Sequence, residues 1–115
     1  MQGKWVNLYN ILKNIEEDFL DYQNRKNLLP IREQLNNIQE FALWFLQKNP
    51  LGMDKEAFIQ AKKEIIAILQ DIVSAIEEND YVLMHDAITY GVMEYLKACN
   101  PELVVFQLFF IQMQF

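Results

Sequence analysis

The sequence is poor in the residue types that carry most enzyme chemistry. It holds one cysteine, Cys99, one histidine, His85, and only two hydroxyl side chains besides those of tyrosine, Ser74 and Thr89. A single cysteine excludes an intramolecular disulfide and a thiolate metal cluster. Because Ser74 has no base near it in the sequence, a nucleophilic triad is not expected. These scarcities favour a protein that is not an enzyme and has no catalytic residues, cofactor or metal.

Glycine and proline are also scarce, with three of each in 115 residues. A phosphate-binding loop needs clustered glycines, so this class of nucleotide site is not expected. The prolines at positions 30, 50 and 101 break the chain into blocks, and two of them follow asparagine. Asparagine before proline favours the end of one element and the start of another.

Basic residues are few and scattered. The chain has 10 lysines and arginines against 16 acidic residues, for a net charge of −6, and its only basic doublets are Arg25-Lys26 and Lys62-Lys63. Nucleic acids and anionic membranes bind clustered positive charge, so neither partner is expected. The N-terminal residues lack the unbroken apolar stretch and cleavage site of a signal peptide, which predicts a cytoplasmic protein.

Apolar residues, 52 % of the chain, recur mostly at spacings of three and four. This period is typical of amphipathic helices. It predicts a single helical domain over 1–115 with helices at about 4–25, 30–48, 54–78, 81–98 and 101–114. The predicted fold class is all-α: an antiparallel four-helix bundle with an additional apolar C-terminal helix.

The helix predicted over 54–78 has the most regular pattern. Asp54 is its predicted N-cap and Asn79 its predicted stop, and Asp80 is the predicted cap of the helix that follows. Its predicted buried face contains Phe58, Ala61, Ile65, Ile68 or Leu69, Ile72 and Ile76. In the next helix, whose stripe is Tyr81, Met84, Ile88, Val92 and Tyr95, Gly91 predicts close approach by a neighbouring helix.

The last thirteen residues, 103–115, carry no charge, and ten of them are apolar. Asn100, Pro101 and Glu102 form a typical helix start before them, although the richness in phenylalanine and valine leaves a strand as the alternative. As a helix, this segment would span about 20 Å, less than the roughly 30 Å of a hydrocarbon core. It is too short to cross a membrane and has no basic flank, so we expect protein to cover it.

Self-association is the favoured way to cover the C-terminal segment. Packing it between two copies of the chain would bury its sides, and a twofold homodimer is the commonest geometry. The predicted contact residues are Phe106, Phe109, Phe110 and Met113, which could meet Trp44 and Phe45 of the second helix. The predicted function is therefore a non-enzymatic protein-interaction module. One alternative is a chaperone-like adaptor whose terminal helix is displaced by a partner helix.

Pairs of carboxylates suggest a second alternative function, that of an all-α magnesium-dependent nucleotide pyrophosphatase. All-α nucleotide pyrophosphatases hold magnesium with Glu-x-x-Glu and Glu-x-x-Asp pairs on adjacent helices. Glu77 and Asp80 have the second spacing, but they fall at a helix junction, and the nearest upstream substitute is Asp18 with Asp21. A solvated acidic face explains these pairs more simply.

His85 lies one turn from both Tyr81 and Thr89 and could form a hydrogen-bonded group with them.

The segment from Asn79 to Asp86, followed by an amphipathic helix to Cys99, resembles a stretch in small uncharacterised helical proteins of Gram-positive bacteria. The usual form of that stretch has a second carboxylate near the position of Tyr90, where this chain departs from it. The resemblance implies a bacterial, cytoplasmic origin. It implies no activity.

Overall fold

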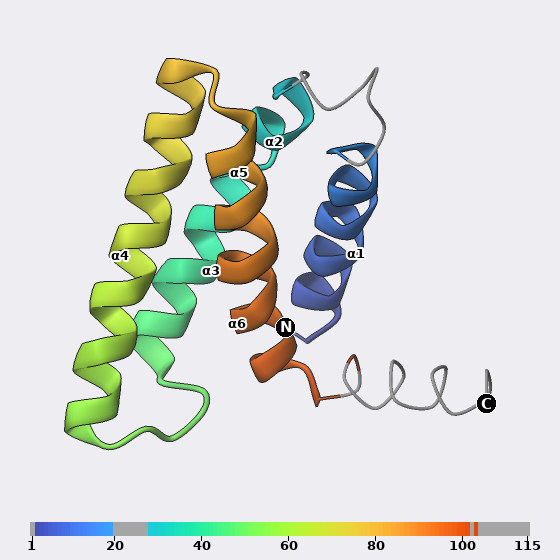
Figure 1. Cartoon of the computed structure of the whole chain (residues 1–115). Coiled ribbons are helices and arrows are strands. Elements are labelled where there is room, and N and C mark those ends of the chain that lie inside the picture. The colour runs from blue at the N-terminus through green and yellow to red at the C-terminus, as the bar shows by residue number, and fades with distance from the viewer. Residues whose placement is uncertain (1, 20–27, 102, 104–115) are drawn as a thin grey trace, which may run out of the picture.

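The computed structural model describes residues 2–19, 28–101 and 103, and the described residues form helices and turns with no strand among them (Figure 1). The helices, in chain order, are α1 (Gln2–Phe19), α2 (Leu29–Glu33), α3 (Leu35–Lys48), α4 (Lys55–Glu78), α5 (Tyr81–Ala87), the π-helical turn η1 (Ile88–Val92) and α6 (Met93–Cys99). The predicted all-α fold class is confirmed for this part of the chain. None of its helices combines the length and the apolarity needed to span a bilayer.

The segment α5–η1–α6 forms one rod that lies between α4 and α1 (Figure 1). The rod packs against α4 through α5 and η1, and against α1 mainly through α6. A short connection over 49–54 turns the chain back, so α4 runs opposite to α3. Since the described helices that contact α4 all lie on one side of it, α4 forms an edge of the described part of the molecule.

The core is built from the predicted apolar stripes. Trp5 of α1 packs edge-on against Phe41 of α3, with ring centroids 5.3 Å apart, and lies 5.5 Å from Trp44. Phe45, which is fully buried, continues the cluster to Tyr95 of α6 at 5.2 Å. Aromatic pairs at these distances add to the stabilisation from buried area, so this cluster holds α1, α3 and α6 together.

The helix predicted over 30–48 is not continuous. It is divided into α2 and α3 at Gln34, whose backbone N–H donates to the carbonyl of Ile31 at 2.9 Å, a bond of the tighter three-residue type. Ile31 is fully buried, so the short α2 anchors the start of this segment in the core. Apolar spacing alone did not reveal this break, because the stripe continues across it.

The helix predicted over 81–98 is continuous but not α-helical throughout. The π-helical turn η1 interrupts it, and the backbone N–H of Met93 donates to the carbonyl of Ile88. Buried side chains occur here at every fourth residue: Met84, Ile88, Val92, Leu96 and Asn100. In a regular α-helix such a row would wind by about 40° per step. The wider turn offsets that winding, which explains why Leu96 is fully buried while the predicted stripe residue Tyr95 is only half-buried.

The predicted caps around α4 are present. Asp54 Oδ1 accepts a hydrogen bond from the Ala57 N–H at 2.9 Å, and Asn79 ends α4 in the left-handed conformation at φ 52°. Asp80 then caps α5 by accepting from the Leu83 N–H at 3.0 Å. Side-chain caps of this kind satisfy backbone N–H groups that the first turn leaves open, so the starts of α4 and α5 are both fixed.

Two predicted helices extend beyond the described residues. The first helix begins at Gln2, earlier than predicted, and residues 20–25 of its predicted range lie outside the described part. Pro101 and Leu103 are helical, whereas residues 104–114 of the predicted C-terminal helix also lie outside it.

Candidate functional site: an exposed apolar row on α4

Three β-branched apolar side chains form a row along the outer side of α4. Ile59, Ile66 and Val73 are 41 %, 41 % and 49 % exposed. They are spaced by seven residues, which is close to two turns of an α-helix, so they lie on one line along the helix. We call these three residues the α4 row.

The row exists because α4 is apolar over more of its circumference than its neighbours cover. The inward side chains of α4, which face α3, α5 and η1, are buried: Ala61, Ile65, Ile72 and Ala75. Leu69 and Ile76 are half-buried and lie between this inward face and the row. The apolar surface of α4 therefore continues from the core onto the outside of the molecule.

A shallow hollow lies along the row. It is lined by Ile66, Leu69, Gln70, Val73 and Ser74. The small side chain of Ser74 and the exposed Ala67 lie on the polar side of the row. Small residues beside apolar ones leave room for another helix to approach closely. The surface is therefore shaped to receive side chains rather than to enclose a small molecule.

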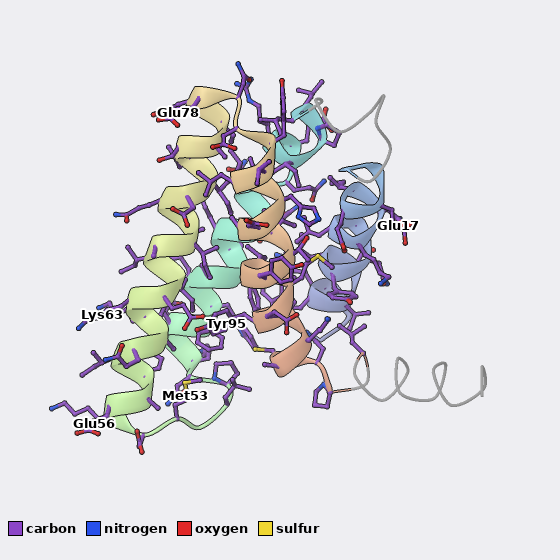
Figure 2. The ribbon with its side chains drawn as sticks, in the orientation of Figure 1. Glu17, Met53, Glu56, Lys63, Glu78 and Tyr95 are labelled. Carbon is purple, nitrogen blue, oxygen red and sulfur yellow. The ribbon has the colours of Figure 1, made fainter. Side chains whose placement is uncertain are left out.

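Charges are distributed unevenly along α4. Its first half, residues 55–66, has three lysines and two glutamates, whereas its second half, 67–78, has Asp71, Glu77 and Glu78 and no basic residue. In Figure 2, Glu78 lies at one end of the helix and Glu56 at the other, with Lys63 between them. Lys55 precedes Ile59 by one turn and Glu77 follows Val73 by one turn, so the row has a basic residue at its start and an acidic residue at its end.

The residues predicted to form an interface are divided between two parts of the chain. Phe106, Phe109, Phe110 and Met113 lie outside the described residues. Trp44 and Phe45 lie in α3, where both join the aromatic cluster with Trp5 or Tyr95. Phe45 is fully buried there, and Trp44 is half-buried.

The start of the C-terminal segment is fixed to the body of the protein. Asn100 is fully buried, and its side-chain N–H donates to the carbonyl of Leu96 at 2.7 Å. The Leu103 N–H donates to the carbonyl of Asn100 at 2.9 Å, and the Leu103 side chain packs against the core. Leu103, the last described residue, is therefore held against the body of the protein.

Gly91 allows the rod to lie close to the inward face of α4. A Cβ atom placed on Gly91 would lie 3.0 Å from the Cγ1 and Cγ2 atoms of Ile68. Such a distance is shorter than ordinary carbon contacts of about 3.5–4.0 Å. The close approach predicted from this glycine is confirmed.

Two neighbours of the His85 side chain are defined in the structure. Its Nδ1 lies 3.6 Å from Asp86 Oδ1, and its ring packs edge-on against Tyr90 at 6.2 Å. The Thr89 hydroxyl is buried and makes no hydrogen bond within the described structure, so it does not join the predicted group. The reason is the π turn, which brings residues five apart onto one side and so places Tyr90 near His85.

The carboxylate pairs considered for magnesium are not assembled into a site among the described residues. Asp80 uses its carboxylate to cap α5, and the side chains of Asp18 and Asp21 lie outside the description. No group of three or more potential ligands occurs within the described residues.

A small cavity of about 20 Å³ between α3, α4 and η1 is lined by apolar side chains and Tyr95. Ligand pockets are typically larger than about 300 Å³.

Two groups among the described residues have shifted pKa values. Burial, together with the charge of Glu64 and a hydrogen bond to it, raises the pKa of Tyr95 to about 12. Burial alone raises the pKa of the Cys99 thiol to about 11. Both shifts favour the neutral form, so at neutral pH neither group is poised to act as a base or nucleophile.

The α4 row also has a signal in the sequence, a repeat of seven residues. The general helical spacing of apolar residues did not distinguish this repeat from the stripe that forms the core. Read every seventh residue, positions 59, 66 and 73 are all β-branched and apolar. A second seam of this kind beside the main stripe marks a helix with two apolar faces.

Comparison with known proteins found no matching family model and no similar curated protein or solved structure.

Proposed function

We propose that this protein is a non-enzymatic helical interaction module that associates with a second copy of itself. The observation that carries the proposal is the α4 row. Single exposed apolar side chains are common on protein surfaces, but three that align along one edge helix gather apolar area on one surface, even though Lys62 and Gln70 lie between them. Covering such a surface with protein removes apolar area from water, and this supplies free energy for association.

The proposal includes the C-terminal segment as a second contact region. Phe106, Phe109, Phe110 and Met113 would add to the apolar surface that a partner covers, as the sequence predicts. Asn100 and Leu103 support this role, because they fix the start of the segment against the core. A fixed start lowers the entropy lost when the segment binds.

The proposal also retains the finer predictions about architecture and setting. These are an antiparallel four-helix bundle with an additional apolar C-terminal helix, a homodimer, and a cytoplasmic bacterial protein. The opposite directions of α3 and α4 and the short connection between them are consistent with the bundle.

Light scattering combined with size-exclusion chromatography tests the proposal on the full chain. We expect a dimer whose fraction rises with protein concentration. A chain that stays monomeric up to its solubility limit would show that self-association is wrong.

A version ending at Leu103 tests the contribution of the C-terminal segment while keeping the core contact of that residue. We expect it to dissociate at higher concentrations than the full chain does. Thermal melts of both versions serve as the folding control. If the shortened chain associates as tightly as the full chain, the segment is not part of the interface, although self-association stands.

A further inference from the structure

We propose that α4 of one copy pairs antiparallel with α4 of a second copy, about a twofold axis that passes beside Ile66. This inference rests on the proposed self-association and specifies its surface and geometry. The occupant of the α4 row is thus the same row of another molecule. Such a contact is isologous, since each copy contributes the same surface, and it closes after two subunits.

The spacing of the row fits this pairing. With the axis beside Ile66, the two Ile66 side chains meet, and Ile59 of each copy faces Val73 of the other, because both lie seven residues from the centre. The paired stretch is about 21 Å long at 1.5 Å per residue. Repeated β-branched residues at every seventh position are typical of one seam position in paired helices.

The shape of the surface also fits a helix. Ile59 of the second copy would lie over the hollow that Leu69, Gln70 and Val73 help to form. Ser74 and Ala67 border the row with small side chains, so the backbone of a second α4 can come close. Side chains from one helix would then fill the spaces between those of the other.

The charges of α4 decide between antiparallel and parallel pairing. In the antiparallel arrangement, Lys55 of one copy lies opposite Glu77 of the other, since both are eleven residues from Ile66. The half with three lysines and two glutamates, a net charge of +1, faces the half with three carboxylates and no basic residue. In a parallel arrangement, Lys55 would face Lys55 and Glu77 would face Glu77. Opposite charges attract and like charges repel across such a seam, so the antiparallel order is favoured.

The charge pattern also distinguishes a second copy from the C-terminal segment as the occupant. Residues 103–115 carry no charge and could cover only the apolar part of the row. A second α4 matches both the apolar residues and the charges at the two ends. The second copy is therefore the better fit.

The substitution Ile66→Glu tests whether the row is the interface. Two glutamates would meet at the axis, and we expect the dimer dissociation constant to rise at least about tenfold, as for a central interface residue. Val82→Glu is the matched control, because Val82 is also apolar and 73 % exposed but lies on α5. Circular dichroism melts at low concentration verify that each variant folds.

Reversal of charge tests the direction of pairing. Lys55→Glu and Glu77→Lys, each alone, should weaken the dimer, and the double variant should restore its affinity. Parallel pairing predicts no such rescue, because each reversed residue would still face its own copy. Added salt should reduce the loss of dimer affinity in both single variants.

Cross-linking gives a direct measure of the geometry. In the full chain with Cys99→Ala, the variants Lys55→Cys and Glu77→Cys are prepared separately, mixed, and treated with a short bis-maleimide. Antiparallel pairing predicts covalent dimers in the mixture and few with either variant alone. Covalent dimers from each variant alone would instead show parallel pairing and overturn the proposed geometry.

Two outcomes separate this inference from the proposed function. If the full chain is dimeric but neither Ile66→Glu nor charge reversal changes its affinity, and no cross-link forms, α4 is not the interface, while self-association stands. If the full chain is monomeric at every concentration, both proposals are wrong.

Discussion

The two apolar faces of α4 have similar composition and different surroundings. The inward face, with Ile65 and Ile72, is covered by α3, α5 and η1, and these side chains are at most 5 % exposed. The outward α4 row, with Ile66 and Val73, is at least 41 % exposed. The amino-acid types alone do not distinguish the faces. The faces differ in exposure because α4 lies at an edge, where its described neighbours cover the inward face and leave the α4 row exposed.

The largest expected effect comes from replacing one isoleucine on each face. Ile72→Ala should lower the free energy of unfolding by about 3 kcal/mol, because it removes buried carbon and leaves a cavity. Ile66→Ala should change it by less than about 0.5 kcal/mol at a concentration where the chain is monomeric. Urea unfolding followed by circular dichroism measures both. Equal changes in the free energy of unfolding would mean that the two faces are equally buried and do not differ as described.

A substitution at Gly91 probes how tightly the inward face is packed. Gly91→Val should lower the free energy of unfolding by about 2 kcal/mol, because its side chain would press on Ile68. Combining it with Ile68→Ala should recover about 1 kcal/mol of that loss in a double-mutant cycle. Thermal unfolding of the four proteins provides the cycle. A Gly91→Val variant more stable than the parent would show that helix propensity outweighs the contact.

The smallest effect concerns Tyr95, which packs on Phe45 and hydrogen-bonds to Glu64 at the margin of the inward face. Its pKa rises from about 10 in the unfolded chain to about 12 in the fold. A raised pKa favours the neutral form, so the stabilisation is complete below pH 10 and is lost as the pH rises from 10 to 12.

The difference in stability between the parent and Tyr95→Phe should therefore be constant up to pH 10 and decrease above it. Denaturant titrations at a series of alkaline pH values measure this difference. Both proteins contain Cys99, whose pKa of about 11 affects them equally. A difference that does not change with pH would mean that the hydroxyl is equally stabilised in the folded and unfolded chains.

The all-α fold class, the caps at Asp54 and Asp80 and the close approach at Gly91 could be predicted from the sequence, because each depends on local spacing or on one residue type. The break at Gln34 and the π turn could not, because the apolar stripes continue through both. The α4 row was missed for a different reason. Periodicity reports that a side is apolar, but only the arrangement of neighbouring helices determines whether that side is covered.

The π turn over Ile88–Val92 also bears on how the chain tolerates a change in its length. Five residues in a π turn advance the helix by about as much as four residues in an α-helix, so the turn accommodates one extra residue. One residue removed from this turn would therefore leave a regular helix with Leu96 and the buried Asn100 still facing the core. One residue removed from α5 or α6 would instead rotate everything that follows by about 100°. We therefore expect evolution to tolerate a deletion within 88–92 more readily than one elsewhere in this rod.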